Sequence, residues 1–366
     1  MLTHLLLILF ILLLYVFIHS FKRGSKISKE KIFLFLSFLL LFVLVATREM
    51  TMGNDTQTYL QVFKKCSMMG FDALNLKYET GYLVFNVLLS YISSRPRFFM
   101  IIMSLIFNAG VYYFIKDNSK NYLLSVIMYI CMLFYYNSMT MMRQFLALVI
   151  VLFSYSALKK GKNISFFLLV ILASTIHSSA IIALLLFPCY KMSHTKKKIT
   201  FIFLVSLIAM LSLDQIIPFI ADFLGKNDLY TNRIGSESLS NVLHFLVFLT
   251  IYLFSLYEVK RNKANKVEKE NFYLNVLFLA AMINMISINM NILSRAALYF
   301  NVFAIVIVPT LINDYIKNKN NVKIVNIALV SILLIYSSAI IYWKPEWNSA
   351  YNYKTCLFRE ESYICE

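Results

Sequence analysis

Residues 2–21 of the chain, LTHLLLILFILLLYVFIHSF, form an uninterrupted apolar run of about 20 residues. With a rise of about 1.5 Å per residue, one helix of this length crosses the roughly 30 Å hydrocarbon core of a bilayer. The run has no basic segment before it and no small-x-small cleavage site, and its first positive charges, Lys22 and Arg23, follow it. We therefore expect a retained first transmembrane helix rather than a secretory signal peptide.

The rest of the chain has the same apolar character. Of its 366 residues, 60% are hydrophobic and only 14% are charged, and the mean hydropathy is +0.70. Soluble globular domains are about 45–50% apolar and about 25% charged, so the composition excludes that class. The sequence predicts an all-α polytopic membrane protein with about 10–12 transmembrane helices. Residues 1–343 are expected to form a single transmembrane domain and residues 344–366 a tail outside the membrane.

Apolar runs separated by polar loops predict ten spans. Residues 80–94 are too short and amphipathic for a simple span, and residues 164–190 are interrupted by the polar string Ser174–Ser179. We expect these two segments to be broken or re-entrant. The predicted spans are 2–21, 32–46, 98–115, 122–136, 139–158, 199–213, 242–257, 271–291, 295–312 and 323–343.

The distribution of basic residues predicts the orientation. The net charge is +17, but Lys and Arg lie in short loops beside apolar runs, which indicates membrane topology rather than nucleic-acid binding. One arrangement places 22 of them in cytoplasmic loops and 11 in the outer loops 47–97 and 214–241 and the tail. Both termini then face outward. The unusual polar residues gather near the outer boundary: Arg48, Asp55, Glu79, Arg143, His177 and Arg295.

Two arginines stand where helices are expected to begin. Arg143 follows Asn137–Met142, and Arg295 precedes a helix in which Tyr299 lies one turn further on the same face. A guanidinium group at a helix N-terminus has the wrong sign for the helix dipole, unless an anion is bound between it and the helix-end N–H groups. Snorkelling of the arginines to the interface is the alternative.

His177 and Asp55 each allow a catalytic and a structural interpretation. His177 sits in an apolar run and could take a proton from a hydroxyl nucleophile, or be a hydrogen-bonded packing residue. Gly53–Asp55 predicts a turn in which Asp55 caps a helix that starts at Thr56. Glu49 and Asp55 are the expected partners of Arg48.

Other site classes have no support in the sequence. The five cysteines lack metal-ligand spacing, and nucleotide-binding and hydrolase motifs are missing, so we expect neither a cofactor nor a metal. Cys131 and Cys189 are expected in the core. Cys356 and Cys365 could pair if the tail faces an oxidising compartment.

The order of short motifs resembles the EpsG family, the Wzy-like polymerases of bacterial exopolysaccharide and capsule clusters. The resemblance covers nearly the whole chain, although Thr80 stands where the family often has Pro. Its motifs in this sequence are Arg48…Gly53-Asn54-Asp55…Tyr59, Glu79-Thr80-Gly81-Tyr82, Met142-Arg143-Gln144…Ala147, His177-Ser178-Ser179-Ala180 and Arg295…Tyr299-Phe300.

The resemblance implies a GT-C-like membrane glycosyltransferase of the bacterial cytoplasmic membrane whose active site faces outward. Such an enzyme transfers a glycan from undecaprenyl pyrophosphate to the terminal hydroxyl of a fresh lipid-linked repeat unit, without a metal ion. Flippase and chain-length regulator proteins are the expected partners, beside the lipid bilayer, and nucleic acid is not one.

The predicted roles follow from this chemistry. His177 is the expected base, with Asp55 or Glu79 as its substitute. Because a planar guanidinium binds phosphate oxygens bidentately, Arg143, Arg295 and Arg48 are predicted to hold the pyrophosphate. Gln144, Tyr59, Tyr82 and Tyr299 are predicted to contact the substrate.

Three alternatives use similar residues. A flippase for lipid-linked sugars would need access from both sides and typically an internal repeat, which the sequence does not show. A membrane sugar O-acyltransferase would need a second polar cluster facing the cytoplasm. A ligase that moves the finished glycan to another acceptor shares the donor chemistry, so sequence does not separate it from a polymerase.

Overall fold

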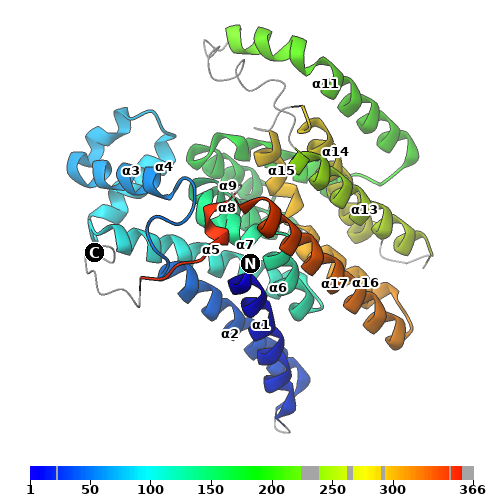
Figure 1. Ribbon diagram of the computed structural model, residues 1–366. Coiled ribbons are helices and arrows are strands. Elements are labelled where there is room, and N and C mark those ends of the chain that lie inside the picture. The colour runs from blue at the N-terminus through cyan, green and yellow to red at the C-terminus, as the bar shows by residue number, and fades with distance from the viewer. Residues whose placement is uncertain (22–23, 224–238, 262–266, 290–292, 346–347, 357–366) are drawn as a thin grey trace. The chain divides into compact units, whose positions relative to one another are not determined.

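The computed structural model describes the chain apart from residues 22–23, 224–238, 262–266, 290–292, 346–347 and 357–366, and apart from the side chains of 213–223 and 267–268. In the described part every regular element is helical, and an isolated antiparallel bridge joins Arg48 to Thr355 (Figure 1). The all-α prediction is confirmed. Most of the predicted outer loop 214–241, and Cys365 with its predicted pairing, lie outside the described residues.

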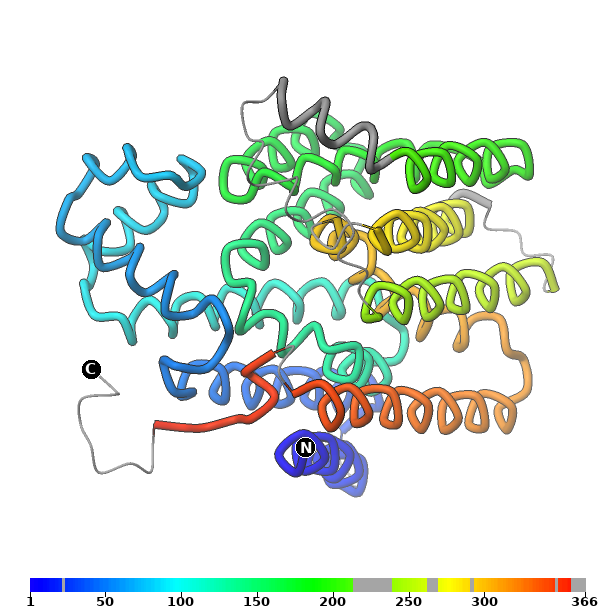
Figure 2. The backbone as a smooth tube through the Cα atoms, turned by 45° about the horizontal axis from the view of Figure 1, so that its top comes forward, coloured from blue at the N-terminus to red at the C-terminus, as the bar shows by residue number. Residues whose placement is uncertain are grey.

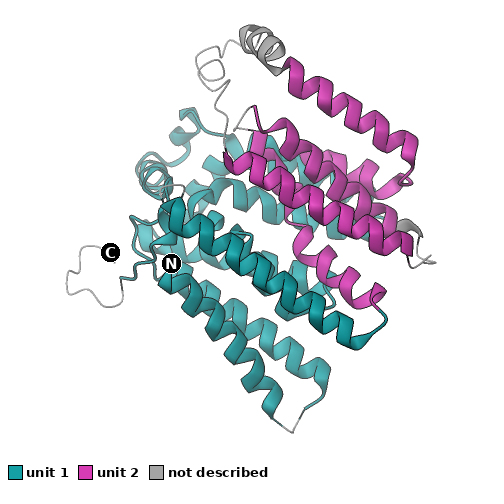
Figure 3. Cartoon of the chain, turned by 45° about the vertical axis from the view of Figure 1, so that its right-hand side comes forward, with its two compact units in different colours: residues 1–181, 317–366 teal, residues 182–316 magenta. Residues whose placement is uncertain are grey.

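The chain divides into two compact units, drawn in different colours in Figure 3. Unit 1 comprises residues 1–181 and 317–366, and unit 2 comprises residues 182–316. The single transmembrane domain expected for 1–343 stays a prediction. The helices of unit 1 are α1 (Leu2–Ser20), α2 (Lys26–Ala46), α3 (Thr56–Met69), η1 (Gly70–Asn75), α4 (Thr80–Ser90), α5 (Pro96–Asn118), α6 (Tyr122–Cys131), α7 (Phe134–Thr140), α8 (Met142–Lys159), α9 (Asn163–Ile176), α17 (Lys319–Trp343) and η6 (Ser349–Tyr351). After η2 (Ser178–Leu185), which runs from one unit into the other, the helices of unit 2 are α10 (Leu186–Lys191), α11 (Lys196–Phe223), α13 (Leu239–Arg261), α14 (Val267–Ile286), α15 (Ser294–Asn301) and α16 (Ala304–Tyr315).

Length and hydropathy make this a multi-pass membrane protein. Six helical segments of the described chain are long and apolar enough to cross a membrane, and the bent pair α6–α7 makes a seventh. Helices α2, α11 and α14 coincide with three further predicted spans, 32–46, 199–213 and 271–291. In lipid a helix satisfies its own backbone hydrogen bonds, which is why apolar runs of this length fold as helices. The six segments are α1, α5, α8, α13, α15–α16 and α17.

The segments expected to be broken are broken. Residues 80–94 form only the short helix α4, and residues 164–190 are split among α9, η2 and α10, with the first interruption at His177. One further bend was not predicted: α6 and α7 meet at 50° beside Leu133, a non-glycine residue with φ of 65°.

Packing within each unit follows the apolar helix faces. In unit 1, α2 packs against α5, α5 against α8, and α8 against α9, while α4 lies between α3 and α9. Phe107 and Phe145 meet across the α5–α8 contact with ring centroids 5.9 Å apart. In unit 2, α14 is central and packs against α10, α11, α13 and α15. Cys131 and Cys189 are buried, as predicted.

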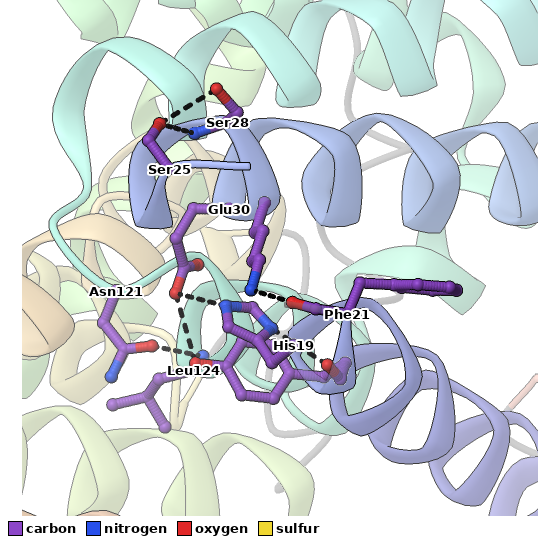
Figure 4. A network of polar contacts seen from close by, with 9 residues as sticks. His19, Phe21, Ser25, Ser28, Glu30, Asn121 and Leu124 are labelled. Carbon is purple, nitrogen blue, oxygen red and sulfur yellow. Dashed lines mark hydrogen bonds and ion pairs between the residues drawn. The ribbon is translucent and has the colours of Figure 1, made fainter. Parts of the chain in front are cut away.

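Polar side chains close the loops at one end of unit 1 (Figure 4). Ser25 accepts a hydrogen bond from the N–H of Ser28 at 3.2 Å, and Asn121 accepts one from the N–H of Leu124 at 3.1 Å. These are N-terminal caps of α2 and α6, which satisfy N–H groups that a helix leaves unpaired. Glu30 accepts a hydrogen bond from Tyr15 at 3.1 Å and lies 3.4 Å from His19.

The chain after α17 folds back onto unit 1 rather than leaving it. Residues 348–356, which we call the C-terminal strap, are the red segment that continues from α17 in Figure 2. The N–H of Cys356 donates to the carbonyl of Thr47 at 3.1 Å, and the N–H of Glu49 donates to the carbonyl of Lys354 at 3.0 Å. The described part of the predicted tail is therefore a packed element of the fold.

Candidate active site

Three helix ends converge in unit 1. Helix α4 begins directly after Glu79, helix α8 begins one residue before Arg143, and helix α9 ends at Ile176, just before His177. Both Glu79 and His177 have extended backbones, with ψ of 134° and 113°. Such interruptions of helices at membrane depth are tolerated only where the chain is buried in protein or lines a cavity, because they leave backbone groups unpaired. Their convergence marks a candidate site.

Glu79 lies at the centre of this site. One carboxylate oxygen accepts a hydrogen bond from the guanidinium group of Arg143. The other oxygen accepts the backbone N–H of Ser178 at 3.1 Å and lies 3.5 Å from Nδ1 of His177. Glu79 thereby joins the starts of α4 and α8 to the end of α9. Sequence reasoning offered Glu79 as a substitute for His177 as the base, whereas the structure places the two side chains in contact.

The contacts keep the carboxyl group of Glu79 ionised. Burial by itself raises the pKa of Glu79, but the interactions with His177, with the N–H of Ser178 and with Arg143 outweigh burial and lower the pKa from 4.5 to about 2. A carboxylate this acidic is a poor proton acceptor at neutral pH. It is well suited to orient and charge-stabilise the imidazole beside it.

His177 is therefore the candidate base of the site. Its side chain is 11% exposed, and its Nδ1 faces the carboxylate of Glu79. A proton on Nδ1 that points at Glu79 leaves Nε2 as the nitrogen that can accept a proton. The break in the helix at His177 also helps to hold Glu79 beside the imidazole. It frees the N–H of Ser178 from helical hydrogen bonding, and this N–H donates to Glu79.

Arg143 is held by a carboxylate and two aromatic rings. Its guanidinium carbon lies 5.3 Å from the ring centroid of Tyr78 and 5.8 Å from that of Tyr82. Both distances are within the range of cation–π attraction. The rings of Tyr59 and Tyr82 meet edge to face with centroids 6.2 Å apart. We call Tyr78, Glu79, Tyr82, Arg143 and His177 the Glu79 cluster.

A glycine allows α4 to approach α9 closely enough for this cluster to form. A Cβ atom on Gly81 would lie 2.8 Å from the carbonyl oxygen of Thr175, with the Thr175 hydroxyl group nearer still. Any side chain at this position would push the two helices apart. Gly81 lies two residues after Glu79 and Thr175 two residues before His177, so their contact sets the separation of the two site residues.

Arg48 lies at a different place, against the end of α7. It is 1% exposed, and its guanidinium group donates to the carbonyl of Met139 at 3.0 Å and to the hydroxyl of Thr56 at 3.4 Å. A third hydrogen bond goes to the sulfur of Met142 at 3.6 Å. The hydrogen bonds described for the Arg48 side chain thus go to α7, α3 and α8 instead of to the carboxylates of Glu49 and Asp55 that the sequence suggested. The Met139 carbonyl belongs to the last turn of α7, where carbonyl groups lack helical partners.

The predicted position of Asp55 as the N-cap of a helix starting at Thr56 is confirmed, but its side chain does not cap the helix. The backbone of Asp55 has ψ of 1°, whereas a capping side chain needs an extended backbone to reach the N–H groups of the first turn. The N–H of Thr56 instead donates to the carbonyl of Gly53 at 3.0 Å.

The predicted substrate-contacting residues are all buried. Tyr59 is 7% exposed, Gln144 2%, and Tyr82 and Tyr299 are both fully buried. Tyr59, Tyr82 and Gln144 belong to unit 1, and Tyr59 packs against Tyr82 of the cluster. Their contact with a sugar stays a prediction.

Arg295 and Tyr299 belong to unit 2. Arg295 is exposed as the second residue of α15, which confirms that it opens a helix, while Tyr299 one turn later is buried. A pair of buried amides fixes α15 to α14: Asn284 donates to Asn301 at 2.8 Å. This hydrogen bond anchors the last residue of α15, whereas Arg295 stands at the start of the same helix.

Sequence reasoning missed two parts of the cluster. Tyr78 adjoins Glu79 in the chain, and its aromatic ring next to an acidic residue could have been noticed as a cation–π partner. The donor N–H of Ser178 carries no side-chain signal. It could be inferred only from the break of the helix at His177, where a freed N–H group needs an acceptor.

Comparison with known proteins agrees with the motif order. The family model described as "EpsG family" matches residues 31–355. No curated protein and no solved structure matches the chain. The match covers nearly the whole chain and every residue of the Glu79 cluster, and the protein therefore belongs to the EpsG family.

Proposed function

We propose that this protein is a polysaccharide polymerase that joins undecaprenyl-pyrophosphate-linked oligosaccharide repeat units on the outer face of the bacterial cytoplasmic membrane. Membership of the EpsG family, a Wzy-like polymerase family, supports a glycosyl transfer of this kind. The observation that carries the proposal is the contact of Glu79 with both His177 and Arg143, because it combines an oriented base with a cation.

The reaction requires a base at the acceptor hydroxyl group. Nε2 of His177 takes the proton as the acceptor oxygen forms its bond to the anomeric carbon of the donor sugar. The bond from that carbon to the pyrophosphate oxygen breaks, and undecaprenyl pyrophosphate leaves with the electron pair. Ionised Glu79 stabilises the imidazolium cation that forms at His177. Asp55, whose carboxyl group is not in the cluster, becomes the weaker candidate for the base.

The departing pyrophosphate requires positive charge and hydrogen-bond donors. A guanidinium group has five N–H donors. Glu79 accepts from Nη1 of Arg143, and Nε of Arg143 has no partner among the residues that the structure describes. In this proposal the remaining N–H donors of the guanidinium group bind the phosphate oxygens while Glu79 holds the group in place. Arg295 is the second cation in the proposal.

Arg48 has another role in this proposal. Its guanidinium group is buried against the Met139 carbonyl, so it stabilises the end of α7 rather than contacting phosphate. Tyr59 packs against Tyr82 of the cluster. Contacts of Tyr59, Tyr82, Gln144 and Tyr299 with the sugar chain remain part of the proposal. Flippase and chain-length regulator proteins are the expected partners of the enzyme in the membrane.

The test is the chain-length profile of surface polysaccharide in a deletion strain complemented with variants. We expect wild type to restore long polymer, while His177→Ala and Arg143→Lys lose about 10²–10⁴-fold in polymerisation and accumulate single lipid-linked repeat units. Arg295→Lys is also expected to lower polymerisation. Arg261→Lys, a change at an exposed arginine at the end of α13, and His19→Ala, far along the chain in α1, are the matched controls.

Other outcomes would contradict the proposal. The level of each variant in the membrane fraction is measured first, so that loss of protein is not taken for loss of activity. Normal chain lengths with altered acylation would identify an O-acyltransferase. Repeat units trapped on the cytoplasmic side would identify a flippase. Normal polymer from both Arg143→Lys and Arg295→Lys would rule out the pyrophosphate contacts.

A further inference from the structure

The break between α7 and α8 sets where Arg143 stands, because Arg143 is the third residue after the last residue of α7. The last turn of α7 is held from outside the helix. The carbonyl of Met139 accepts hydrogen bonds from Arg48 at 3.0 Å and from the hydroxyl of Thr56 at 3.1 Å. Gly53 lies against the same carbonyl, since a Cβ atom on it would be 2.5 Å from that oxygen.

Asn348 of the C-terminal strap holds the side chains of the same turn. Its Oδ1 accepts the hydroxyl of Thr140 at 2.7 Å, and its Nδ2 donates to the side-chain oxygen of Asn137 at 3.3 Å. Asn348 is 3% exposed, so these hydrogen bonds are shielded from water. Asn348 is more than 200 residues away from both partners in the sequence.

The strap itself is anchored along its length after Asn348. The N–H of Gly53 donates to the hydroxyl of Ser349 at 2.9 Å, and the N–H of Ser349 donates to the side chain of Asn54 at 2.8 Å. Further along, Tyr351 packs against Tyr136 of α7 with ring centroids 5.5 Å apart, and Thr355 forms the bridge with Arg48. The strap thus links the α2–α3 loop to the end of α7.

We propose that Asn348 is a positioning residue: by binding Thr140 and Asn137 it fixes the α7–α8 break, and so keeps Arg143 against Glu79. Asn348 does not contact the Glu79 cluster itself, and its effect passes along the chain through residues 140–143. Its importance for glycosyl transfer rests on the proposed function, but its effect on the break does not.

Two pairs of variants test the hydrogen bond between Thr140 and Asn348. Thr140→Val removes the hydroxyl group and keeps the shape of the side chain, while Thr140→Ser keeps the hydroxyl group. Asn348→Ala removes the strap's donor and acceptor, while Asn352→Ala makes the same change at an exposed asparagine of the strap. Each protein is purified at full length, and its thermal stability is compared with that of wild type.

The first measurement is hydrogen–deuterium exchange of peptides that cover residues 137–145. Thr140→Val loses the hydrogen bond to Asn348, and Asn348→Ala loses that hydrogen bond and the one to Asn137. We expect exchange to rise by about tenfold in Thr140→Val and by at least as much in Asn348→Ala, and to stay at the wild-type rate in Asn352→Ala and Thr140→Ser. The double variant Asn348→Ala/Thr140→Val is expected to exchange hardly faster than Asn348→Ala alone, because the hydrogen bond that Thr140→Val removes is already lost in Asn348→Ala.

The second measurement is polymerisation of lipid-linked repeat units in membrane vesicles. We expect kcat to fall by about 10- to 100-fold in Asn348→Ala and Thr140→Val with KM little changed, because the strap does not contact the substrate, and Thr140→Ser to retain activity. Unchanged exchange over 137–145 in Asn348→Ala would overturn the inference, whatever the polymer shows.

The remaining outcomes separate the two proposals. Faster exchange together with wild-type kcat in both variants would also overturn the inference, since the break would then not position Arg143. If the wild-type chain makes no polymer, the proposed function fails. The exchange comparison then still supports or overturns the fixing of the α7–α8 break by Asn348.

Discussion

At the scale of single residues, Glu79 shows how one carboxylate can organise a site. It accepts hydrogen bonds from Arg143 and from the N–H of Ser178, and it faces Nδ1 of His177. A buried carboxylate is costly unless donors of this kind surround it. Its low pKa shows that the donors more than offset the cost of burial. The sequence alone cannot distinguish such a carboxylate from a catalytic base.

The ionisation of Glu79 predicts a pH-dependent stability. Because its pKa in the folded protein, about 2, lies below the ordinary 4.5, ionised Glu79 stabilises the fold at pH above 4.5. This contribution is lost as the pH falls from 4.5 towards 2. We expect Glu79→Gln to be less stable than wild type by roughly 3 kcal/mol at pH 7 and the difference to shrink at pH 3.

Thermal unfolding of the two proteins in detergent at pH 7, 4.5 and 3 measures this difference. Glu30→Gln, a change in the α1–α2 network, is the control for a carboxylate whose interactions lie at another end of unit 1. A Glu79→Gln deficit that is the same at pH 7 and pH 3 would contradict the prediction.

At the scale of elements, short and interrupted helices bring the site residues together. Helix α4 has 11 residues and α7 only 7, and both are too short to span a bilayer. The start of α4, the break between α7 and α8, and the end of α9 place Glu79, Arg143 and the N–H of Ser178 at helix ends instead of inside long helices. Close packing of α4 on α9 then brings Glu79 to His177.

Gly81→Ala tests this packing. The added methyl group would contact the Thr175 carbonyl at 2.8 Å, which is shorter than real Cβ contacts, so α4 must move away from α9. We expect polymerisation to fall by about 10- to 100-fold, because the Glu79–His177 contact lengthens. The chain-length profile in the complemented strain measures the effect.

The control for Gly81→Ala is Ser90→Ala, at the other end of α4. The hydroxyl of Ser90 donates only within its own helix, to the carbonyl of Val87. Wild-type chain lengths in Gly81→Ala, at normal protein level, would show that the α4–α9 separation does not limit the reaction.

At the scale of the whole molecule, the distribution of positive charges predicts which side of the membrane the Glu79 cluster faces. We place the Glu79 cluster at the outer boundary of the membrane and the C-terminal strap outside it. The α1–α2 network with Glu30 and Lys29 is placed in the cytoplasm. This orientation rests on the excess of Lys and Arg in loops such as 22–31 and 258–270.

Cysteine labelling tests the orientation. In a chain with Cys365→Ser, the four remaining cysteines are buried, so an added exposed cysteine dominates the reaction with thiol reagents. We expect a membrane-impermeant reagent to label Asp72→Cys, between α3 and α4, in intact cells. Ser28→Cys at the start of α2 is expected to react only after the membrane is permeabilised.

The parent Cys365→Ser chain is the control for background labelling. The opposite pattern, with Ser28→Cys labelled in intact cells and Asp72→Cys protected, would show that the Glu79 cluster faces the cytoplasm. A polymerase that acts on the outer face would then be excluded.

Hydropathy and helix-breaking residues are local properties, so the sequence by itself determined the all-α class, the spans, and the interruptions beside Arg143 and His177. The tertiary structure alone decided the partners. Glu79 meets Arg143 across 64 residues and the N–H of Ser178 across 99, and Asn348 meets Thr140 across 208. Such contacts depend on how helices pack, as at Gly81 and Thr175, and no local periodicity encodes that packing. For the same reason the sequence assigned Arg48 to carboxylates beside it in the chain, whereas packing brought it the Met139 carbonyl.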